Sequence, residues 1–299
     1  MYPINKQTTF YVMSCRGYRF LERIIEAFGA QIVHTVVSSL DSGVKQDCYA
    51  AIEALCSEHG IPFFSRQSAG PVETDYAFAV GWRWMIETEK RLIIFHDSLL
   101  PRYRGFAPLV ASLINQEPEI GVTALFASDD YDCGDIIAQR SLTVSYPIRI
   151  AEAIERITPL YCELGLELIE KMIKDQPITG VKQVEQEATY SLWRDERDYQ
   201  IDWLDSAFSI RRFIDAVSFP YQGACTLLNG KKVRIMNALP LQDVVIDNRS
   251  SSIGKVIFME DGYPVVVCGT GLLKLTEIVE DEAPNHSILP LRKFRSRFY

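Results

Sequence analysis

Long apolar runs are missing from this chain of 299 residues. Its longest candidates, such as "PVVVCGTGLL" at 264–273, are short and interrupted by glycine, whereas a membrane-spanning helix needs about 20 apolar residues. The first residues, "MYPINKQTTF", contain no basic stretch followed by an apolar one, so no secretory signal is predicted. We therefore expect a cytoplasmic protein that is not embedded in a membrane.

The cysteines lack the spacing of a zinc site or a disulfide framework. Seven are present, an odd number, and no two of them form a C-x-x-C pair. In a reducing compartment, cysteines scattered in this way are expected to be small buried apolar residues. The sequence therefore predicts neither a disulfide nor a metal at these positions, which are Cys15, Cys48, Cys56, Cys133, Cys162, Cys225 and Cys268.

Positive charge is also scarce. Lysine and arginine together number 31 against 39 aspartate and glutamate residues, which gives a formal net charge of −8. Because nucleic-acid affinity comes largely from Lys and Arg neutralising phosphates, this balance argues against a nucleic-acid partner. The one basic cluster, "LRKFRSRFY" at 291–299, is expected to be a solvated end or a last strand beside acidic neighbours.

Common catalytic signatures are absent as well. The chain has no Walker loop, no serine or cysteine in a nucleophile elbow, and no metal-ligand spacing. These absences disfavour a covalent intermediate or a metal cofactor. They favour direct transfer of a group to an incoming nucleophile.

The first half of the chain alternates short β-rich runs with amphipathic ones, from Thr8 to about Ile173. This alternation is typical of parallel strands joined by crossover helices, and it predicts an open α/β sheet. Strands are expected at 8–14, 31–38, 61–64, 75–82, 91–96, 119–128 and 135–144, and helices at 19–29, 45–60, 107–115 and 148–175.

The pattern changes towards the end of the chain. Residues 176–190, "QPITGVKQVEQEATY", are polar and contain proline and glycine, which is typical of a linker. After them comes one expected helix, at 206–218, and several short strands separated by the turn signals "LNGKK", "MEDGY" and "CGTG". We therefore expect a catalytic domain over 1–175, a linker over 176–190, and a small antiparallel barrel over 191–299.

Two stretches converge on a candidate site, "FHDSLLPRYRG" at 95–105 and "GVTALFASDDYDCGDIIAQ" at 121–139. In open α/β sheets the ligand lies beyond the carboxyl ends of the strands, where His96 and the turn at 81–83 both fall. A histidine there can exchange a proton with a reacting group, and Asp132 could orient it or receive a proton. Arg102 and Arg104 could meet a phosphate or carboxylate.

Each of these residues also has a purely structural interpretation. His96 could be a satisfied structural histidine, and Asp132 a turn former. The two arginines could be solvated, and Trp82 and Trp84 could be packing residues. Composition and periodicity alone therefore predict no more than a two-domain α/β protein.

The motifs themselves resemble those of the formyltransferases that use 10-formyltetrahydrofolate. "HDSLLPRYRGFAPL" is similar to the SLLP loop of methionyl-tRNA formyltransferase and of the sugar N-formyltransferases, and "GVT" at 121–123 and "DCGDIIAQ" at 132–139 follow at the expected distance. "YQIDW" at 199–203 and the stretches at 210–233 and 254–275 resemble the C-terminal barrel of those enzymes. The resemblance covers most of the chain.

This resemblance implies a Rossmann-like domain that carries folate and catalysis, followed by an OB-like β-barrel. It also implies a catalytic trio, Asn-x-His together with an aspartate from a D-x-G turn. The histidine corresponds to His96 and the aspartate to Asp132, but Ile94 stands where the family has asparagine. Because an oxyanion donor contributes about 3 kcal/mol, we expect catalysis with an altered oxyanion site.

The resemblance further implies residues for the cosubstrate and the acceptor. The turn "GWRWMI" and the SLLP loop are expected to hold 10-formyltetrahydrofolate, and no metal is expected. The cofactor-binding positions are Gly81, Trp82, Arg83, Trp84, Met85, Ile86, Ser98, Leu99, Leu100, Pro101 and Asp129. The substrate-binding positions are Arg102, Tyr103, Arg104 and Trp193.

Three acceptors are compatible with this family: methionyl-tRNA, a nucleotide-linked amino sugar, and glycinamide ribonucleotide. From Ser191 to Tyr299 the fourteen basic residues equal the fourteen acidic ones, which disfavours tRNA, and the second domain disfavours the glycinamide enzymes. "SLWRDERDYQIDW" most resembles the sugar formyltransferases, so we predict N-formylation of a nucleotide-linked amino sugar for a surface glycan such as lipopolysaccharide. A folate-binding module without transfer stays open because of Ile94, as does pairing into a homodimer.

Overall fold

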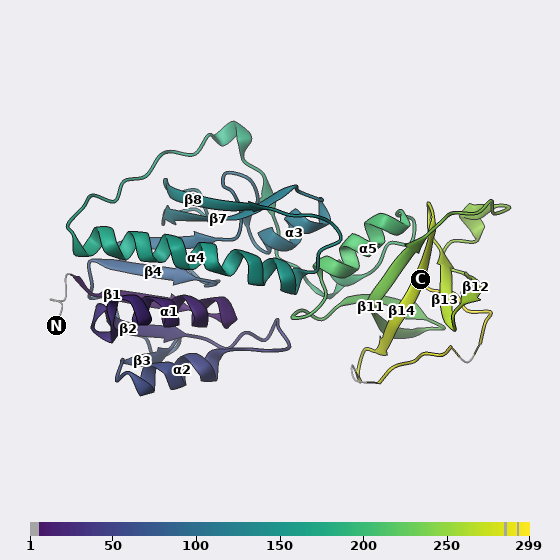
Figure 1. The fold of residues 1–299 in the computed structure, drawn as a ribbon, viewed down its shortest axis with the longest axis horizontal. Helices are drawn as coiled ribbons and strands as arrows, with labels where there is room; N and C mark the ends of the chain where they lie inside the picture. The colour runs from purple at the N-terminus through teal and green to yellow at the C-terminus, as the bar shows by residue number, and fades with distance from the viewer. Residues whose placement is uncertain (1–5, 284–285, 292) are drawn as a thin grey trace. The chain divides into compact units, whose positions relative to one another are not determined.

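The computed structural model describes residues 6–283, 286–291 and 293–299 (Figure 1). The chain divides into two compact units, and each is interrupted in sequence. Unit 1 comprises Met1–Leu109, Pro118–Val144 and Glu152–Leu192, and unit 2 comprises Val110–Glu117, Ser145–Ala151 and Trp193–Tyr299.

The core of unit 1 is a seven-stranded sheet in the order β3-β2-β1-β4-β5-β7-β8. The first five strands in this order pair in parallel, whereas β7 pairs antiparallel with both β5 and β8. This is the Rossmann-like α/β arrangement that the sequence predicts. The strands are β1 (Thr8–Val12), β2 (Val33–Ser38), β3 (Phe63–Ser65), β4 (Tyr76–Val80), β5 (Arg91–His96), β7 (Glu119–Phe126) and β8 (Ile136–Thr143).

Helices and short elements complete this part of the chain. The helices are α1 (Ser14–Phe28), α2 (Tyr49–Glu58), α3 (Pro108–Ile114) and α4 (Ile150–Ile173), with 3-10 turns η2 (Ala30–Ile32) and η3 (Glu185–Glu187). Two further short strands, β6 (Arg104–Gly105) and β9 (Tyr190–Ser191), pair in parallel with each other.

The two faces of the unit 1 sheet are covered differently. On one face lie α1 and α4 (Figure 1), and there Phe95 meets Phe20 of α1 and Tyr161 of α4, with ring centroids 5.0 and 6.0 Å away. The connections β3–β4 and β4–β5 contain no helix. The opposite face therefore carries an apolar cluster whose rim is only partly buried. Its buried members are Tyr11, Val37, Val72, Ala77, Ala79 and Leu92, and its partly buried members are Ala69, Trp82, Ile86, Ile94 and Ala127.

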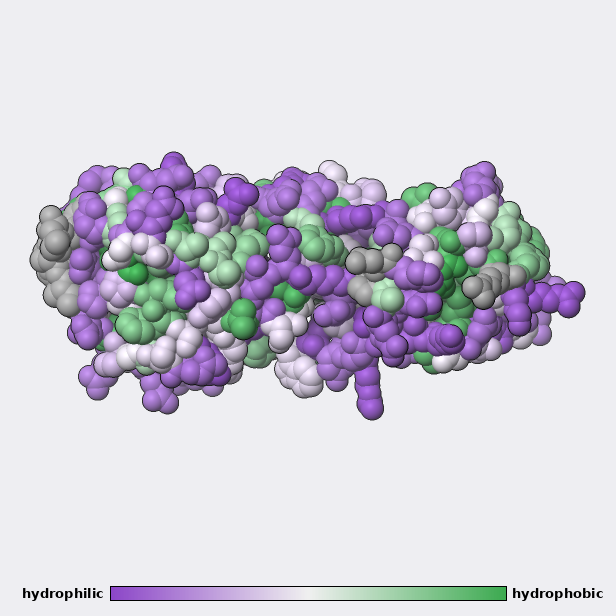
Figure 2. All heavy atoms as spheres, turned by 90° about the horizontal axis from the view of Figure 1, so that it is seen from below, coloured by the Kyte–Doolittle hydropathy of each residue, from purple (hydrophilic) through white to green (hydrophobic). Residues whose placement is uncertain are grey.

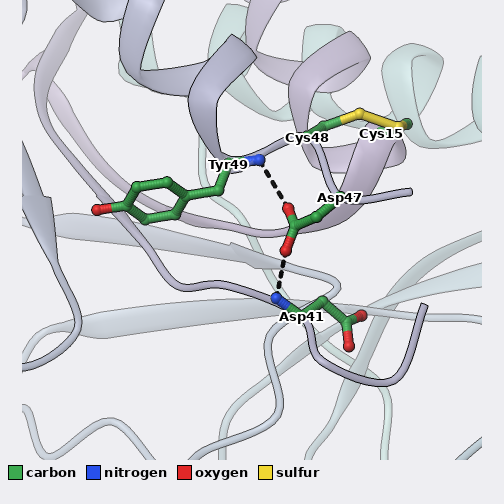
Figure 3. Close-up of a disulfide and its surroundings, with 5 residues drawn as sticks. All are labelled: Cys15, Asp41, Asp47, Cys48 and Tyr49. Carbon is green, nitrogen blue, oxygen red and sulfur yellow. Dashed lines mark hydrogen bonds between the residues drawn. A yellow bond between two sulfur atoms is a disulfide. The ribbon is translucent and has the colours of Figure 1, made fainter. Parts of the chain in front are cut away.

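A disulfide joins Cys15, in the first turn of α1, to Cys48, which immediately precedes α2 (Figure 3). The prediction that none of the cysteines is paired is therefore wrong for these two. They are 33 residues apart in sequence, so no short spacing could reveal them. The fold brings their Cα atoms to 5.1 Å, a separation that a disulfide can span.

The loop before Cys48 is held at several further points. The Asp47 carboxylate accepts hydrogen bonds from the backbone N–H groups of Tyr49 and Asp41 (Figure 3). The Asp41 carboxylate in turn forms an ion pair with Arg83. The disulfide thus lies in a loop that is tied to the segment following β4.

Reduction of this disulfide is expected to lower the free energy of unfolding by about 2–4 kcal/mol, because the cross-link restricts the unfolded chain. Urea unfolding with and without dithiothreitol measures the effect. A Cys15→Ser/Cys48→Ser variant, already without the bond, should unfold at the same urea concentration in both conditions. An unchanged midpoint for the reduced wild-type chain would contradict the expectation.

Unit 2 contains helix α5 (Ala207–Ala216) and a five-stranded antiparallel sheet in the order β10-β11-β14-β13-β12. The strands are β10 (Ala224–Leu228), β11 (Lys231–Leu241), β12 (Val256–Glu260), β13 (Tyr263–Val267) and β14 (Leu272–Glu280), and the 3-10 turns are η4 (Glu196–Tyr199) and η5 (Arg249–Ser251).

Two hairpins of this sheet confirm the predicted turns. Asn229 and Gly230 join β10 to β11, and Asp261 and Gly262 join β12 to β13, all four with positive φ between 52° and 83°. That backbone matches the twist of the flanking strands and favours Asn-Gly and Asp-Gly sequences.

The last residues of the chain lie between the two edge strands. Phe298 bridges to Leu228 of β10, and Arg297 bridges to Lys255 just before β12. This segment therefore connects the two edges of the sheet, as expected for a small OB-like barrel. The basic cluster at 291–299 thus makes isolated bridges rather than a full strand, and the bridged residues Leu228 and Lys255 are not the acidic neighbours that were expected; Arg292 lies outside the described residues.

Across the described part of the chain, no helix combines the length and the apolar composition needed to span a membrane. On the face drawn in Figure 2, apolar side chains are interspersed with polar and charged ones.

Candidate active site

The site is built on the carboxyl end of β5. His96 is the last residue of this strand, and because strand side chains alternate between faces, Ile94 and His96 lie on the same face. The loop that follows is anchored to β7 and β8. The Thr123 hydroxyl donates to Ser98 O at 2.6 Å, and Gln139 Nε2 donates to Leu100 O at 2.9 Å.

Sequence reasoning assigned no role to Thr123 or Gln139, although both belong to motifs that it singled out. Thr123 is fully buried, and its hydroxyl also accepts from the Leu100 backbone N–H at 3.1 Å and from Gln139 Nε2 at 2.8 Å. The only available signal was a polar residue within a buried apolar strand. Such a residue needs a partner, and here the partner is the SLLP loop.

His96 and Asp132 come together as predicted, and both are buried. Asp132 Oδ1 lies 3.4 Å from His96 Nδ1, and Asp132 Oδ2 accepts the Gly105 backbone N–H at 2.8 Å. His96 Nε2 lies 2.8 Å from the Tyr103 carbonyl oxygen, and because a carbonyl only accepts, Nε2 must carry the hydrogen. A neutral ring would then turn a bare Nδ1 lone pair towards a carboxylate, so the arrangement fits an imidazolium.

Backbone conformation around this pair is unusual. Tyr103 and Asp132 have positive φ values of 60° and 56°, which non-glycine residues adopt only where their surroundings enforce it. Gly105 has a positive φ of 99°, and its lack of a side chain is needed as well, because a Cβ there would lie 2.5 Å from Ser191 O. The two loops are therefore shaped by contacts with residues far along the chain.

Ile94 occupies the position of the expected asparagine, and the residues around it are apolar as well. Ile94 is partly buried and shares a cluster with Trp82 and Ile86 of the turn predicted to hold the cosubstrate. The indole Nε1 of Trp82 and the hydroxyl of Ser14 are buried, and neither finds a hydrogen-bond partner within the described ranges. This cluster thus combines apolar surface with unused polar atoms.

The other residues of the predicted cosubstrate turn lie in different surroundings. Arg83 is ion-paired with Asp41, and Met85 is exposed. Trp84 lies edge-on to Trp82 and beneath the Arg66 guanidinium. Gly81 supplies a positive φ of 66° where the chain leaves β4. The structure therefore brings Trp82 and Ile86, rather than all six residues, to the cluster that contains Ile94.

The predicted pocket residues after His96 form the loop itself. Ser98 donates its hydroxyl to Arg102 O at 2.6 Å, and Leu100 is buried. Leu99 lies against Gly121 of β7, and Pro101 accepts from the Thr189 backbone N–H. Asp129 is exposed on the turn that precedes Asp132.

Arg104 does not fit the prediction that it binds an anionic acceptor. Its side chain is 1% exposed and is ion-paired with Glu185, which is 2.8 Å away. It also donates to Gln183 Oε1 and to the Tyr190 hydroxyl. The hydrogen bond that Arg104 donates to Glu185 raises the pKa of Arg104, and the same contact lowers the pKa of Glu185. The guanidinium is thus committed to partners within the chain.

The remaining acceptor residues differ in exposure. Arg102 is exposed, and its guanidinium lies 5.4 Å from the centre of the Tyr103 ring, which is itself buried. Trp193 is exposed and belongs to unit 2. Of the predicted acceptor residues in unit 1, only Arg102 therefore presents its side chain at the surface.

Two family models match this chain. "Formyl transferase" matches residues 79–158, which include β5, His96 and Asp132, and "Formyl transferase, C-terminal domain" matches residues 195–289. The chain belongs to the formyl transferase family. The first of these matches covers both loops that meet at the candidate site of this formyl transferase.

Curated relatives are methionyl-tRNA formyltransferases. The protein of Syntrophomonas wolfei subsp. wolfei is 31% identical over 183 residues, covering 61% of this chain and 57% of the relative. That of Methylococcus capsulatus is 29% identical over 242 residues, covering 76% of each. The match to the first relative thus spans little more than half of that protein's length.

Solved structures share the fold of this formyl transferase at low identity. An N-formyltransferase from Helicobacter canadensis, in complex with folinic acid and dTDP-3-aminofucose, has a TM-score of 0.65 at 17% identity, covering 90% of this chain and 98% of that one. HypX from Aquifex aeolicus, in complex with tetrahydrofolic acid, has a TM-score of 0.61 at 20% identity, covering 91% of this chain and 44% of that one. At these identities the likeness establishes the fold alone.

Proposed function

We propose that this formyl transferase moves a formyl group from 10-formyltetrahydrofolate to the amine of a nucleotide-linked amino sugar. The observation that carries the proposal is the buried His96–Asp132 pair at the carboxyl end of β5, beside the partly open cluster of Trp82, Ile86 and Ile94. Family membership supports the class of reaction, and the geometry supports the place where it occurs.

The chemistry requires stabilisation of negative charge and removal of a proton. The cosubstrate supplies an activated formyl carbon. When the acceptor amine attacks it, a carbon–nitrogen bond forms and charge develops on the formyl oxygen. As this charge returns to the carbonyl, the bond between the formyl carbon and N10 of the cosubstrate breaks, and tetrahydrofolate leaves with a proton on N10. Both nitrogens of His96 face groups of the protein, so in this arrangement the ring acts through its positive charge. Asp132, or a water that it orients, takes the proton that the amine loses.

Folate binding is supported by the composition of the cluster around Ile94. The apolar side chains of Ile86 and Ile94 provide a surface for a flat heterocycle. Trp82 offers both an aromatic face and an indole N–H that has no hydrogen-bond partner among the described residues. The unpaired hydroxyl of Ser14 lies beside the Gly81 turn. A pterin ring is apolar on its faces and polar at its edge. Its faces suit the apolar side chains, and its edge can supply partners for the Trp82 N–H and the Ser14 hydroxyl, because buried polar atoms are normally hydrogen-bonded.

The charge distribution of the chain suits an acceptor that is small and anionic. Arg102 is exposed next to the site loop and can meet a diphosphate, whereas the net charge of −8 and the neutral balance after Ser191 offer little for a tRNA backbone. The H. canadensis enzyme, which has the same fold, was solved with dTDP-3-aminofucose. These observations favour the nucleotide-linked amino sugar.

Methionyl-tRNA is the second candidate acceptor. The observation that favours it is the 31% identity to the S. wolfei relative, which is a methionyl-tRNA formyltransferase.

One assay separates the candidates. The purified chain is incubated with 10-formyltetrahydrofolate and either a panel of nucleotide-linked amino sugars or charged initiator tRNA, and formylated products are identified by mass spectrometry. We expect product from at least one amino sugar. Product from tRNA alone would overturn the proposed acceptor. Tetrahydrofolate binding without product from any acceptor would instead indicate a folate-binding module.

A further inference from the structure

We infer that Gln183 is a positioning residue of this active site, whose side-chain amide, aligned by Arg104, holds the Asp132 turn against His96. The inference deepens the proposed function and rests on it. Gln183 belongs to the segment 176–190, which the sequence suggested as a linker.

This segment follows the site closely within unit 1. Val181 forms an antiparallel bridge to Ile136 at the start of β8. Thr189 is bonded to the SLLP loop at three points. Its hydroxyl accepts the Tyr103 N–H at 2.9 Å, its carbonyl accepts the Arg104 N–H at 2.8 Å, and its own N–H donates to Pro101 O at 3.2 Å. The segment 181–191 therefore frames both loops that carry the catalytic pair.

Gln183 stands where the two loops are joined. Its Nε2 donates to Asp132 O at 2.7 Å and to Gly134 O at 2.8 Å, so both amide hydrogens bind the Asp132 turn. Its Oε1 accepts from Arg104 Nε at 3.0 Å and Nη2 at 2.9 Å. Since a guanidinium only donates and a carbonyl only accepts, just one orientation of the amide satisfies all four contacts.

The Arg104 side chain is held in turn by charge. Its ion pair with Glu185 compensates a guanidinium that is almost completely buried, and such a charge would be costly without a partner. Arg104 is also the first residue of β6, next to Gly105, whose N–H binds Asp132 Oδ2. Arg104 and Gln183 therefore fix the turn from its backbone side, while Gly105 fixes the carboxylate.

The position of the Asp132 carboxylate matters because its ion pair with His96 is already long. Asp132 Oδ1 lies 3.4 Å from His96 Nδ1, beyond an ordinary charge-assisted hydrogen bond, and Asp132 has a left-handed backbone that its contacts must maintain. If the turn moved outwards, His96 would lose its facing charge. Asp97, the next residue, is paired with Arg16 and leaves no unbalanced charge beside the ring.

The test is Gln183→Glu. A glutamate still offers oxygens to Arg104, but it replaces the two donated hydrogens with a second oxygen that repels Asp132 O and Gly134 O. We expect kcat to fall about ten- to a hundredfold, as misplacement of a catalytic group does, with KM for the folate donor changed less than about threefold. The matched control is Gln186→Glu, the same substitution at an exposed position three residues away, which should behave as the wild-type chain does.

A second readout does not depend on turnover. The chain has four histidines, and the His96 ring can be followed by NMR of labelled protein, assigned with a His96→Gln variant. If Gln183 holds Asp132 in place, Gln183→Glu should change the chemical shifts of the His96 ring, whereas Gln186→Glu should leave them unchanged.

A merely structural role would lower the urea midpoint without changing the chemical shifts of the His96 ring, and that result, like an unchanged kcat, would overturn the inference. A wild-type chain that formylates none of the acceptors would count against the proposed function instead. The chemical shifts of the His96 ring would still decide whether Gln183 positions Asp132.

Discussion

Replacing Asp132 with asparagine is expected to lower kcat/KM for formyl transfer by about 10²–10⁴-fold, the usual contribution of a positioned acid–base group. The variant should still fold. Asparagine has almost the same shape, and its Oδ1 can accept the Gly105 N–H as Asp132 Oδ2 does at 2.8 Å. Its Nδ2 would then donate to His96 Nδ1.

That exchange is what makes the substitution informative. With Nδ1 accepting and Nε2 still donating to Tyr103 O, His96 becomes a fully satisfied neutral ring. The site then loses both the charge that faces the developing oxyanion and the carboxylate that receives the proton. Steady-state kinetics at several pH values, with the urea midpoint measured alongside, separate lost chemistry from lost stability.

Asp130→Asn is the matched control, because Asp130 is exposed on the same turn. Within the described residues its backbone carbonyl accepts a hydrogen bond from Ser128, and its side chain has no hydrogen-bond partner. Its activity should stay close to that of the wild-type chain. Should Asp132→Asn retain activity within about threefold, Asp132 would be a turn former, and the proposed mechanism would be wrong.

The second large effect is expected from Ile94→Asn, and it runs in the opposite direction. One oxyanion donor contributes about 10²–10³-fold in kcat in other enzymes. Ile94 stands two residues before His96 on the same face of β5, at the position where the motif resemblance implies an asparagine. Restoring the amide should raise kcat, by up to about 10²-fold, without tighter binding of the folate donor.

A cost in stability should accompany this gain. Ile94 is partly buried among apolar side chains, and an amide placed there without complete hydrogen bonding costs about 1–3 kcal/mol. Ile94→Leu serves as the control, because it keeps the site apolar and should bring no gain in kcat. A folded Ile94→Asn variant with reduced kcat would show that Ile94 is not simply a lost donor.

Much of the fold was predictable because its signals are local. Alternating apolar runs predicted the strands and helices of unit 1, and Asn-Gly and Asp-Gly predicted two hairpins of unit 2, where all four residues have positive φ. The His96–Asp132 pair was predictable from motif resemblance together with the rule that ligands lie at the carboxyl ends of parallel strands.

Other features depend on residues that meet only after folding. Arg104 was expected to bind an anionic acceptor, yet its partners are residues of the chain itself, 79 and 81 positions further along. The Cys15–Cys48 disulfide spans 33 residues, and the polar segment 176–190 has the composition of a linker although it frames the site. Periodicity and turn chemistry describe a residue's own neighbourhood, so the sequence by itself determined the elements, the hairpins and the family. Only the tertiary structure decided which buried polar groups pair across long sequence separations. It determined that Arg104 is ion-paired within the chain and that Gln183 binds the Asp132 turn. The physical reason is that such groups find their partners only when distant segments are brought together.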